Sequence, residues 1–158
     1  WNGPGSQQSL VGRRGATVGA GLYASKAYLE RKGCPTRVED LADHTCVGWS
    51  MGDYFGWPTT DEGAPVVPNH VAFRAGSPAT HVRGIEAGFG IGVTSHRLAR
   101  QHRGVERVLP DFNSSLDLWV VAHETVRKSA RIRAAFDHII EQMTADNAYF
   151  SRGAASVL

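Results

Sequence analysis

The chain has 158 residues, 42% of them hydrophobic, and its 17 Lys and Arg residues against 15 Asp and Glu residues give a net charge of +2. This length corresponds to about one domain, and the hydrophobic share is enough for a core, which argues against disorder along the whole chain. The balanced charge argues against a free-standing nucleic-acid binder, and no run of about 18 apolar residues predicts a membrane helix.

Alternating strands and helices are predicted along the chain. In chain order, strands are expected over residues 10–12, 16–18, 21–24, 46–49, 70–75, 90–94, 105–109 and 116–122, and helices over residues 26–32, 38–42, 78–87, 95–101 and 132–143. Residues 1–9, 50–70 and 144–158 carry turn formers without periodicity and predict loops and a tail. This alternation favours an α/β fold with a mixed, mostly parallel sheet flanked by helices.

The helix boundaries carry recognisable capping residues. Ser25 is expected to cap the helix over 26–32, which Gly33 ends, because a hydroxyl accepts a free backbone N–H and glycine tolerates the reversed backbone. Thr36 is expected to cap the turn over 38–42 in the same way. Ser77 and Pro78 are typical of a helix start, since proline at the first helical position loses no hydrogen bond.

The two cysteines and the start of the chain indicate the cellular compartment. Cys34 and Cys46 lack the spacing of a zinc site, and we expect two reduced thiols, although a disulfide stays open. No charged and apolar leader marks the chain for secretion, so a cytoplasmic protein is expected. Because the chain starts at Trp1, we expect it to be a piece of a longer protein.

Four consecutive blocks resemble the effector-binding domain of LysR-type transcriptional regulators. They read GLYASKAYLERKG (21–33), VEDLADHTCVGW (38–49), FRAGSPATHVRGIEAGFGIGVTSHRLA (73–99) and RVLPDFNSSLDLWVVAHETVRKSARIRAAFDHIIEQM (107–143). The resemblance implies a two-lobed fold like that of periplasmic binding proteins, with a small effector between the lobes. It implies no enzymatic activity, no cofactor and no metal, and a homo-oligomer, dimer or tetramer, in the full-length protein.

The resemblance also implies a domain organisation. Residues 1–143 would hold the second lobe with the closing strand and helix of the first, and residues 144–158 a C-terminal tail. DNA would be bound by an N-terminal winged helix-turn-helix that these 158 residues lack. The absent part of the first lobe would leave an apolar stripe of the last helix bare, so this chain alone is expected to self-associate. The stripe consists of Ile132, Phe136, Ile139, Ile140 and Met143.

Candidate effector contacts follow three predicted strands. Gly76, Ser77 and Pro78 place a helix N-terminus at a strand end, where free N–H groups favour a negative group. The other candidates are Ser50 and Met51, after the second strand block, and Thr94 and Ser95. Such an edge predicts a small anionic or carbonyl-bearing effector. Capping alone would also explain Ser77, and ordinary loop polarity would explain the rest.

The remaining motifs do not favour catalysis, metal binding or phosphate binding. The Gly88-x-Gly90-x-Gly92 series precedes a strand, the reverse of a phosphate-binding loop, and is interpreted as a tight turn. The seven histidines lack metal-ligand spacing, and no GxSxG elbow holds a nucleophile. A basic run is interpreted as a solvated face; it comprises Arg97, Arg100, Arg103 and Arg107. A solute-binding protein or an α/β enzyme with a similar lobe is the alternative to a sensor.

Overall fold

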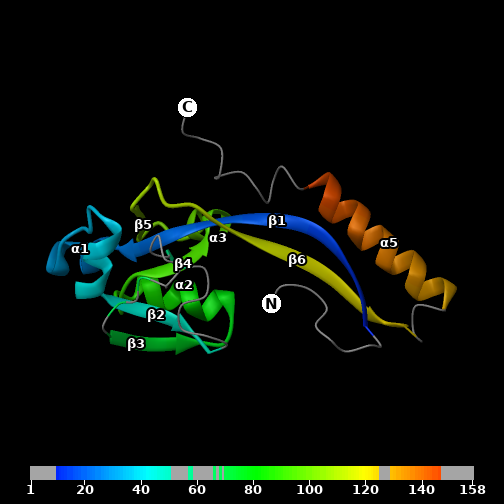
Figure 1. The fold of residues 1–158 in the computed structure, drawn as a ribbon, viewed down its shortest axis with the longest axis horizontal. Coiled ribbons are helices and arrows are strands. Elements are labelled where there is room, and N and C mark those ends of the chain that lie inside the picture. Colours follow the sequence, from blue (N-terminus) through cyan, green and yellow to red (C-terminus); the bar gives the residue numbers. More distant parts are fainter. Residues whose placement is uncertain are drawn as a thin grey trace. The chain divides into compact units, whose positions relative to one another are not determined.

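The computed structural model describes residues 10–50, 57–58, 66, 68, 70–124 and 129–146. Its elements, shown in Figure 1, are β1 (Leu10–Ser25), α1 (Lys26–Lys32), the 3-10 helix η1 (Val38–Asp43), β2 (Thr45–Trp49), β3 (His70–Ala75), α2 (Pro78–Glu86), β4 (Gly92–Ser95), α3 (His96–Ala99), β5 (Val105–Val108), β6 (Ser114–His123) and α5 (Ala130–Ala145). The expected loops over 1–9 and most of 50–70, and the tail beyond residue 146, lie outside the described residues. Among the described helices, none has the length and apolar character needed to cross a membrane.

The chain divides into two compact units. Unit 1 comprises Trp1–Val18 and Ser115–Leu158, and unit 2 is the continuous segment Gly19–Ser114. The chain passes from one unit to the other twice, within β1 and at the start of β6. Unit 2 contains all the predicted effector contacts.

The first strand is longer than expected. Three pieces were expected between residues 10 and 24, because glycines interrupt the apolar pattern, but β1 continues from Leu10 to Ser25. Two of these glycines make room for side chains from distant segments. A Cβ on Gly15 would lie 2.7 Å from Met143 Sδ, and one on Gly21 would lie 2.9 Å from His96 Cε1. The glycines therefore serve packing and do not break the strand.

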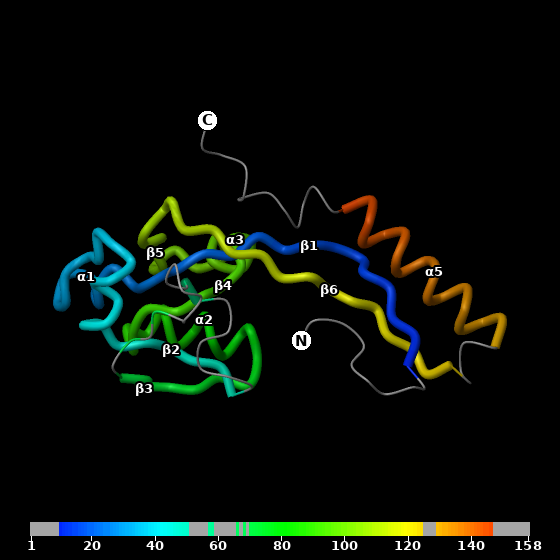
Figure 2. Tube along the Cα trace, in the orientation of Figure 1, coloured from blue at the N-terminus to red at the C-terminus, as the bar shows by residue number. Residues whose placement is uncertain are grey.

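The sheets of unit 2 are mixed, as expected, but they are not mostly parallel, because β1 runs against both of its neighbours there. β1 pairs antiparallel with β4 and with β5, and β2 pairs parallel with β3. A parallel bridge between Cys46 and Ile91 joins β2 to the segment that leads into β4. Consequently β2, β3, β4 and β5 run in one direction and β1 in the other, which Figure 2 lets the reader follow. The carboxyl ends of four strands therefore meet at one edge.

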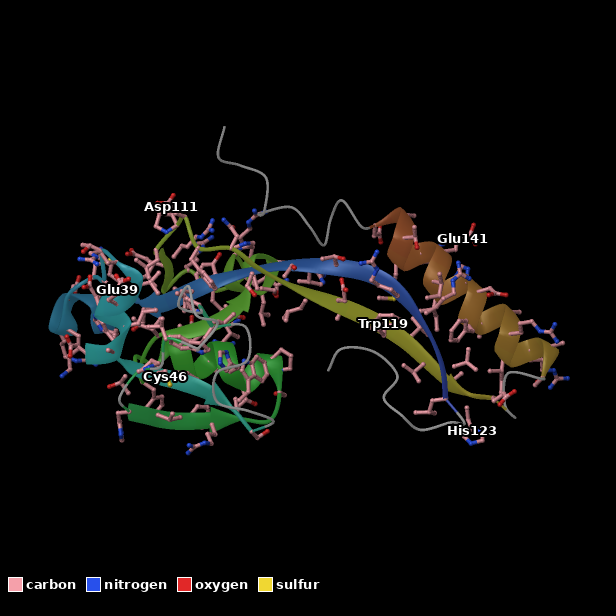
Figure 3. All side chains as sticks on the ribbon, viewed as in Figure 1. Glu39, Cys46, Asp111, Trp119, His123 and Glu141 are labelled. Atoms are coloured by element: carbon pink, nitrogen blue, oxygen red, sulfur yellow. The ribbon has the colours of Figure 1, made fainter. Side chains whose placement is uncertain are left out.

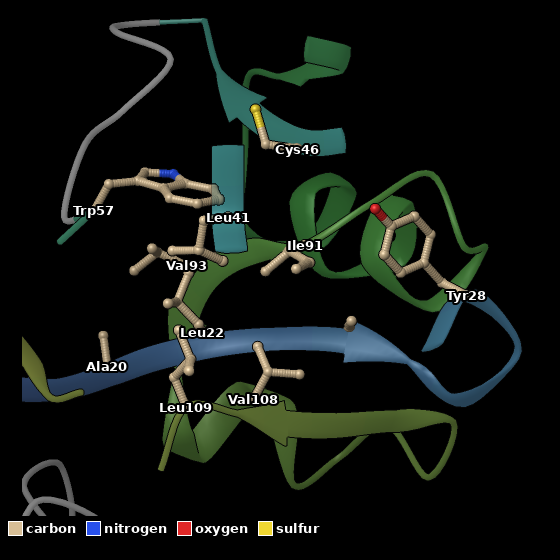
Figure 4. Close-up of a cluster of buried hydrophobic side chains, with 11 residues drawn as sticks. Ala20, Leu22, Tyr28, Leu41, Cys46, Trp57, Ile91, Val93, Val108 and Leu109 are labelled. Atoms are coloured by element: carbon tan, nitrogen blue, oxygen red, sulfur yellow. The ribbon is translucent and has the colours of Figure 1, made fainter. Parts of the chain in front are cut away.

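A hydrophobic core fills one face of this sheet. Leu22, Leu41 and Ile91 have no exposed surface, and Tyr28 and Val108 are nearly as buried (Figure 4). Burying a side chain of this size stabilises a fold by about 1.5–3 kcal/mol. Alternate residues of β1 point to the other face, where Tyr23 packs with Val47, Ile85 and Ala99. Both faces of β1 are thus covered in unit 2.

Local capping follows the sequence in α1 but not in η1. The Ser25 hydroxyl accepts the N–H of Tyr28 at 3.2 Å, and Gly33 ends α1 with a φ of 84°. The expected cap at Thr36 is wrong, because Arg37 takes the N-cap position of η1. The Asp40 carboxylate instead accepts the N–H groups of Thr36 and Arg37, at 2.8 and 3.0 Å. These bonds hold the pKa of Asp40 below its ordinary value.

In unit 1, α5 begins and ends near the predicted positions, but its apolar stripe is not bare. Phe136 and Ile140 are buried, with 6% and 3% of their surface exposed. The expectation of a bare surface is therefore wrong for Phe136, and Ile139, 46% exposed, lies on the open side of the helix. Figure 3 shows the side chains of unit 1, among them Trp119 on β6 and Glu141 on α5. No apolar residue of β6 is fully buried in the described chain.

Both cysteines are free thiols, which confirms the preferred expectation. Cys34 is exposed in the segment after α1, whereas Cys46 is buried in β2. A buried cysteine behaves as a small hydrophobic residue, and Cys46 belongs to the core cluster.

Candidate functional site

Strand register brings the predicted contacts of unit 2 to one edge of the sheet. Trp49 pairs with Ala75, and Cys46 bridges to Ile91. The bridge places the segment that leads into β4 beside β2. Ser50 and Gly76 directly follow β2 and β3, and Ser95 is the last residue of β4, where it pairs with Ala20 of β1. In open α/β sheets this edge, at the carboxyl ends of the strands, is where ligands bind.

The start of α2 has the expected form. Ser77 is the N-cap and Pro78 follows in the first turn. The Ser77 hydroxyl accepts the N–H of Thr80 at 3.2 Å and lies 2.9 Å from the Thr80 hydroxyl. The capping role of Ser77 is therefore confirmed. Because α2 starts at the edge described above, its dipole favours negative charge there.

We expect Ser77→Ala to destabilise the chain by about 1 kcal/mol, the typical cost of losing an N-cap hydroxyl. Without the Ser77 hydroxyl, the N–H of Thr80 loses its acceptor. Urea unfolding at neutral pH measures this change. Ser115→Ala, at an exposed position of β6, is the control and is expected to change the free energy of unfolding by less than about 0.5 kcal/mol.

Ser95 also caps a helix, while Thr94 does not. The Ser95 hydroxyl accepts the N–H of Leu98 at 3.2 Å at the start of α3. The helix is shorter than expected and ends at Ala99. Thr94 has 4% of its surface exposed, and its hydroxyl makes no hydrogen bond to another group in the described ranges.

Ser50 and Gly76 lie next to each other at the ends of β2 and β3. The Ser50 N–H donates to Ala75 O at 3.0 Å, which extends the pairing of the two strands by one residue. A Cβ on Gly76 would lie 3.7 Å from Ser50 Oγ. Within the part of the chain that the structure describes, the Ser50 hydroxyl has no hydrogen-bond partner. Met51, the remaining candidate, lies outside the described residues.

A histidine that sequence reasoning did not single out lies behind this edge. His81 of α2 is fully buried, donates from Nε2 to Val47 O at 3.0 Å and stacks on Trp49 with ring centroids 4.2 Å apart. Burial lowers the pKa of His81 to about 4. The neutral ring therefore fixes Trp49, and with it the end of β2. Its position four residues after Ser77 is the signal that the sequence offered, since it faces the sheet.

Arg107 is not part of a solvated basic face, contrary to expectation. Its Nη2 donates to Pro110 O at 2.7 Å, to Phe112 O at 3.1 Å and to Asn113 Oδ1 at 2.8 Å. The guanidinium therefore holds the turn between β5 and β6, in which Leu109 has a φ of 48°. Left-handed backbone is strained in a residue with a side chain, and these bonds offset that strain.

His96 is a second buried histidine beside Arg107. Its Nδ1 lies 2.8 Å from the Tyr23 hydroxyl, and 3% of its surface is exposed. Burial, and then the charges of Arg107 and Arg100, lower the pKa of His96 to about 4. A neutral, hydrogen-bonded ring at this position joins β1 to α3 and supports the strand end without facing solvent.

The glycine series after α2 is a tight turn, as interpreted. Gly88 has a φ of 79°, which only glycine adopts readily. A Cβ on Gly90 would overlap the backbone of Thr45, and one on Gly92 would lie 2.8 Å from His81 Cε1. The glycines thus let the chain turn and let β4 approach β2 and α2.

A groove elsewhere in unit 2 contains none of the predicted contacts. It has a volume of about 280 Å³ and lies between the segment Cys34–Val38 and the turn Arg107–Phe112. No group of three His, Cys, Asp or Glu side chains is arranged to hold a metal ion in the described residues. The edge with Ser50, Gly76, Ser77 and Thr94 is therefore the candidate site.

Comparison with known proteins gives one consistent picture. A family model, the LysR substrate binding domain, matches residues 2–144. The sequence is 29% identical over 138 residues to the probable HTH-type transcriptional regulator LtrA of Klebsiella pneumoniae. That alignment covers 80% of this chain and 44% of LtrA, so the chain spans less than half of that relative.

Solved structures agree in fold. The regulatory domain of CrgA, a LysR-type transcriptional regulator from Neisseria meningitidis, superposes with a TM-score of 0.72 at 23% identity, over 89% of this chain and 72% of CrgA's domain. The regulatory domain of the C227S variant of AphB from Vibrio vulnificus gives a TM-score of 0.67 at 25% identity, over 88% and 75% of the two chains. The expected α/β fold of the periplasmic-binding-protein type is confirmed.

Proposed function

Because this chain belongs to the family of LysR substrate-binding domains, we propose that it senses a small effector for a transcriptional regulator. The effector binds at the edge of unit 2 formed by the ends of β2, β3 and β4. Binding favours one conformation of the regulator over another and so changes its affinity for DNA. The proposal includes no catalytic step and no cofactor.

One observation carries this proposal. The edge combines the start of α2 with two hydroxyls, those of Ser50 and Thr94, that make no hydrogen bond to the described residues. The Ser50 side chain is exposed and the Thr94 side chain is buried, and a hydroxyl beside a helix start can donate to a ligand with acceptor oxygens. Ser77 and Ser95 accept in their caps; Ser95 keeps an O–H to donate, whereas the Ser77 hydroxyl also shares a hydrogen bond with the Thr80 hydroxyl.

The chemistry of the edge favours a small anionic or carbonyl-bearing effector. None of the candidate contacts carries a charge, so the attraction for an anion comes from the N–H groups and dipole of α2. A carboxylate or ketone oxygen matches the hydroxyl donors, whereas a cation would meet no negative group among these residues.

The division of the chain supports the proposed domain organisation. Unit 2, Gly19–Ser114, is a continuous compact unit and is proposed as the second lobe. The described part of unit 1 is proposed as the closing strand and helix of the first lobe. In the longer regulator, a winged helix-turn-helix outside these 158 residues would bind DNA, and the protein would act as a cytoplasmic homo-oligomer. No observation in the described residues favours a solute-binding protein or an enzyme.

A binding screen with two variants tests the site. We expect small carboxylates such as benzoate, but not the cation benzylammonium, to raise the melting temperature of the 158-residue chain. Ser50→Ala and Thr94→Val should each weaken binding about tenfold, the cost of one lost hydrogen bond to a charged group. Ser114→Ala, a hydroxyl at the start of β6, is the control that should bind like the parent. Equal binding by all variants would place the site elsewhere.

A further inference from the structure

Two polar side chains meet beside Gly21, and each has one buried nitrogen without a partner. His96 comes from the start of α3 and Arg107 from β5, and a Cβ on Gly21 would lie 2.9 Å from His96 Cε1 and 3.4 Å from Arg107 Nε. The His96 side chain is buried, with 3% of its surface exposed. Within the described part of the chain, His96 Nε2 and Arg107 Nε are buried and make no hydrogen bond. Buried polar groups are normally paired, so two unpaired nitrogens at one glycine are unusual.

Both unpaired nitrogens are hydrogen-bond donors. The Tyr23 hydroxyl lies 2.8 Å from His96 Nδ1 and has no other hydrogen-bond partner in the described residues. If this hydroxyl donates to Nδ1, only Nε2 stays unpaired, whereas the opposite direction would leave the buried hydroxyl proton unpaired as well. The proton of the neutral ring therefore lies on Nε2. Arg107 Nε also carries a proton, because a guanidinium group has donors only.

Positive charge surrounds these two donors. Arg107 Nη2 donates to two carbonyl oxygens and to the Asn113 side chain, none of which is charged. Among the described residues, no carboxylate forms an ion pair with Arg107. Burial first, and then the charges of Arg107 and Arg100, lower the pKa of His96, so both guanidinium groups act on this ring. The acceptor that matches this arrangement is negatively charged.

We propose that His96 Nε2 and Arg107 Nε bind a small monovalent inorganic anion, such as chloride, within unit 2. An ion that accepts both N–H groups lies about 3 Å from each nitrogen, and both side chains reach it because both pack on Gly21. A water molecule fits less well, because its own two protons need acceptors and the unpaired buried nitrogens at Gly21 are donors. The ion joins α3 to β5 across β1. It is separate from the effector contacts and does not depend on the proposed function.

Exchange of the anion at constant ionic strength tests the proposal. The 158-residue chain is melted in sodium gluconate, whose anion is too large to be enclosed, and in mixtures with a rising share of sodium chloride or sodium bromide. We expect the melting temperature to rise by about 3–5 °C for each tenfold increase in halide above the dissociation constant, because the ion binds only the folded chain. Equal melting temperatures in chloride and gluconate would overturn the anion site.

A pair of histidine variants locates the bound ion. His96→Phe removes the Nε2 donor and should abolish the halide dependence of the melting temperature. His81→Phe is the matched control, because His81 is also fully buried but pairs through Nε2 with Val47 O, and burial lowers its pKa without any contribution from an arginine. The control should keep the full halide dependence. The same dependence in His96→Phe as in the parent would place the ion elsewhere and overturn the proposal.

A second measurement needs no variant and decides the case if His96→Phe does not fold. Crystals of the 158-residue chain soaked in bromide should show an anomalous peak about 3–3.5 Å from both His96 Nε2 and Arg107 Nε. A soaked crystal with both side chains ordered and no peak between them would overturn the proposal. Either failure leaves the proposed effector site untouched, since no acid is present in these experiments.

Discussion

Lowering the pH from 7.5 to 4.5 should destabilise unit 2 by several kcal/mol, because two buried histidines must stay neutral in the folded chain. Burial lowers the pKa of His81 and of His96 from 6.5 to about 4. Between pH 6.5 and pH 4, each of the two rings binds a proton in the unfolded chain but not in the folded chain. Stability is therefore fully present above pH 6.5 and falls as the pH decreases toward 4.

The expected size is large relative to the stability of a domain. A pKa difference of this kind corresponds to at most about 3 kcal/mol for each ring. Small domains are stable by about 5–15 kcal/mol, so the two rings together can decide whether unit 2 folds. His44 acts in the same direction, since burial lowers its pKa as well.

Urea unfolding at several pH values between 7.5 and 4.5 measures this loss. His81→Phe keeps the stacking on Trp49 and removes one titrating group, so its stability should depend less steeply on pH than that of the parent. His138→Gln, at an exposed position of α5, is the matched control and should keep the parental slope. If the stability of His81→Phe depends on pH as steeply as that of the parent, His81 is protonated in the folded chain without loss of stability.

Gly90→Ala should destabilise the chain by about 3–5 kcal/mol, which combines overpacking against a backbone with the loss of strand pairing. The new Cβ would overlap the carbonyl of Thr45, which cannot move as a flexible side chain could. It would thereby break the hydrogen bonds from Ile91 N to Thr45 O, 2.9 Å, and from Val47 N to Ile91 O, 2.8 Å. These hydrogen bonds fix the position of the segment leading into β4 along β2.

The consequence for the candidate site distinguishes this change from ordinary destabilisation. Loss of the Ile91 bridge shifts Thr94 relative to Ser50, so acid binding should fall even under conditions where Gly90→Ala is folded. Circular dichroism and chemical unfolding measure the stability, and calorimetric titration measures the binding. Gly104→Ala, whose Cβ would meet Glu86 Cγ at the ordinary contact distance of 3.6 Å, should leave both unchanged. A Gly90→Ala chain of parental stability would refute the close approach of the two segments.

Features that depend on a few neighbouring residues could be predicted from the sequence. Ser25, Ser77 and Ser95 were each placed at a helix start, and each hydroxyl accepts an N–H three residues on. The same local physics predicted Gly33 and Gly88 at helix ends. It failed at Thr36, because the Thr36 hydroxyl donates to Asp40 Oδ2 at 3.0 Å and Arg37 takes the N-cap position.

The candidate site was predicted in part. Ser50, Gly76 and Ser77 follow strands in the sequence and Thr94 ends a predicted strand, and the fold class alone suggested that the strand ends would meet. Their common level depends on the pairing of Trp49 with Ala75 and on the bridge to Ile91. That register is a property of the sheet and has no local signature.

The sequence by itself determined the family, the α/β class, the caps and the strand ends that could bind an effector. The tertiary structure decided which polar residues are free to do so. In the folded chain, β1 continues through Gly15 and Gly21 as one strand, and Arg107 holds the turn after β5. His96 is buried against Tyr23, 73 positions away in the chain. Capping and turn hydrogen bonds join residues three or four positions apart, so they can be predicted from the local sequence. Burial and register are set by partners far apart in the sequence, so they emerge only when the chain is folded.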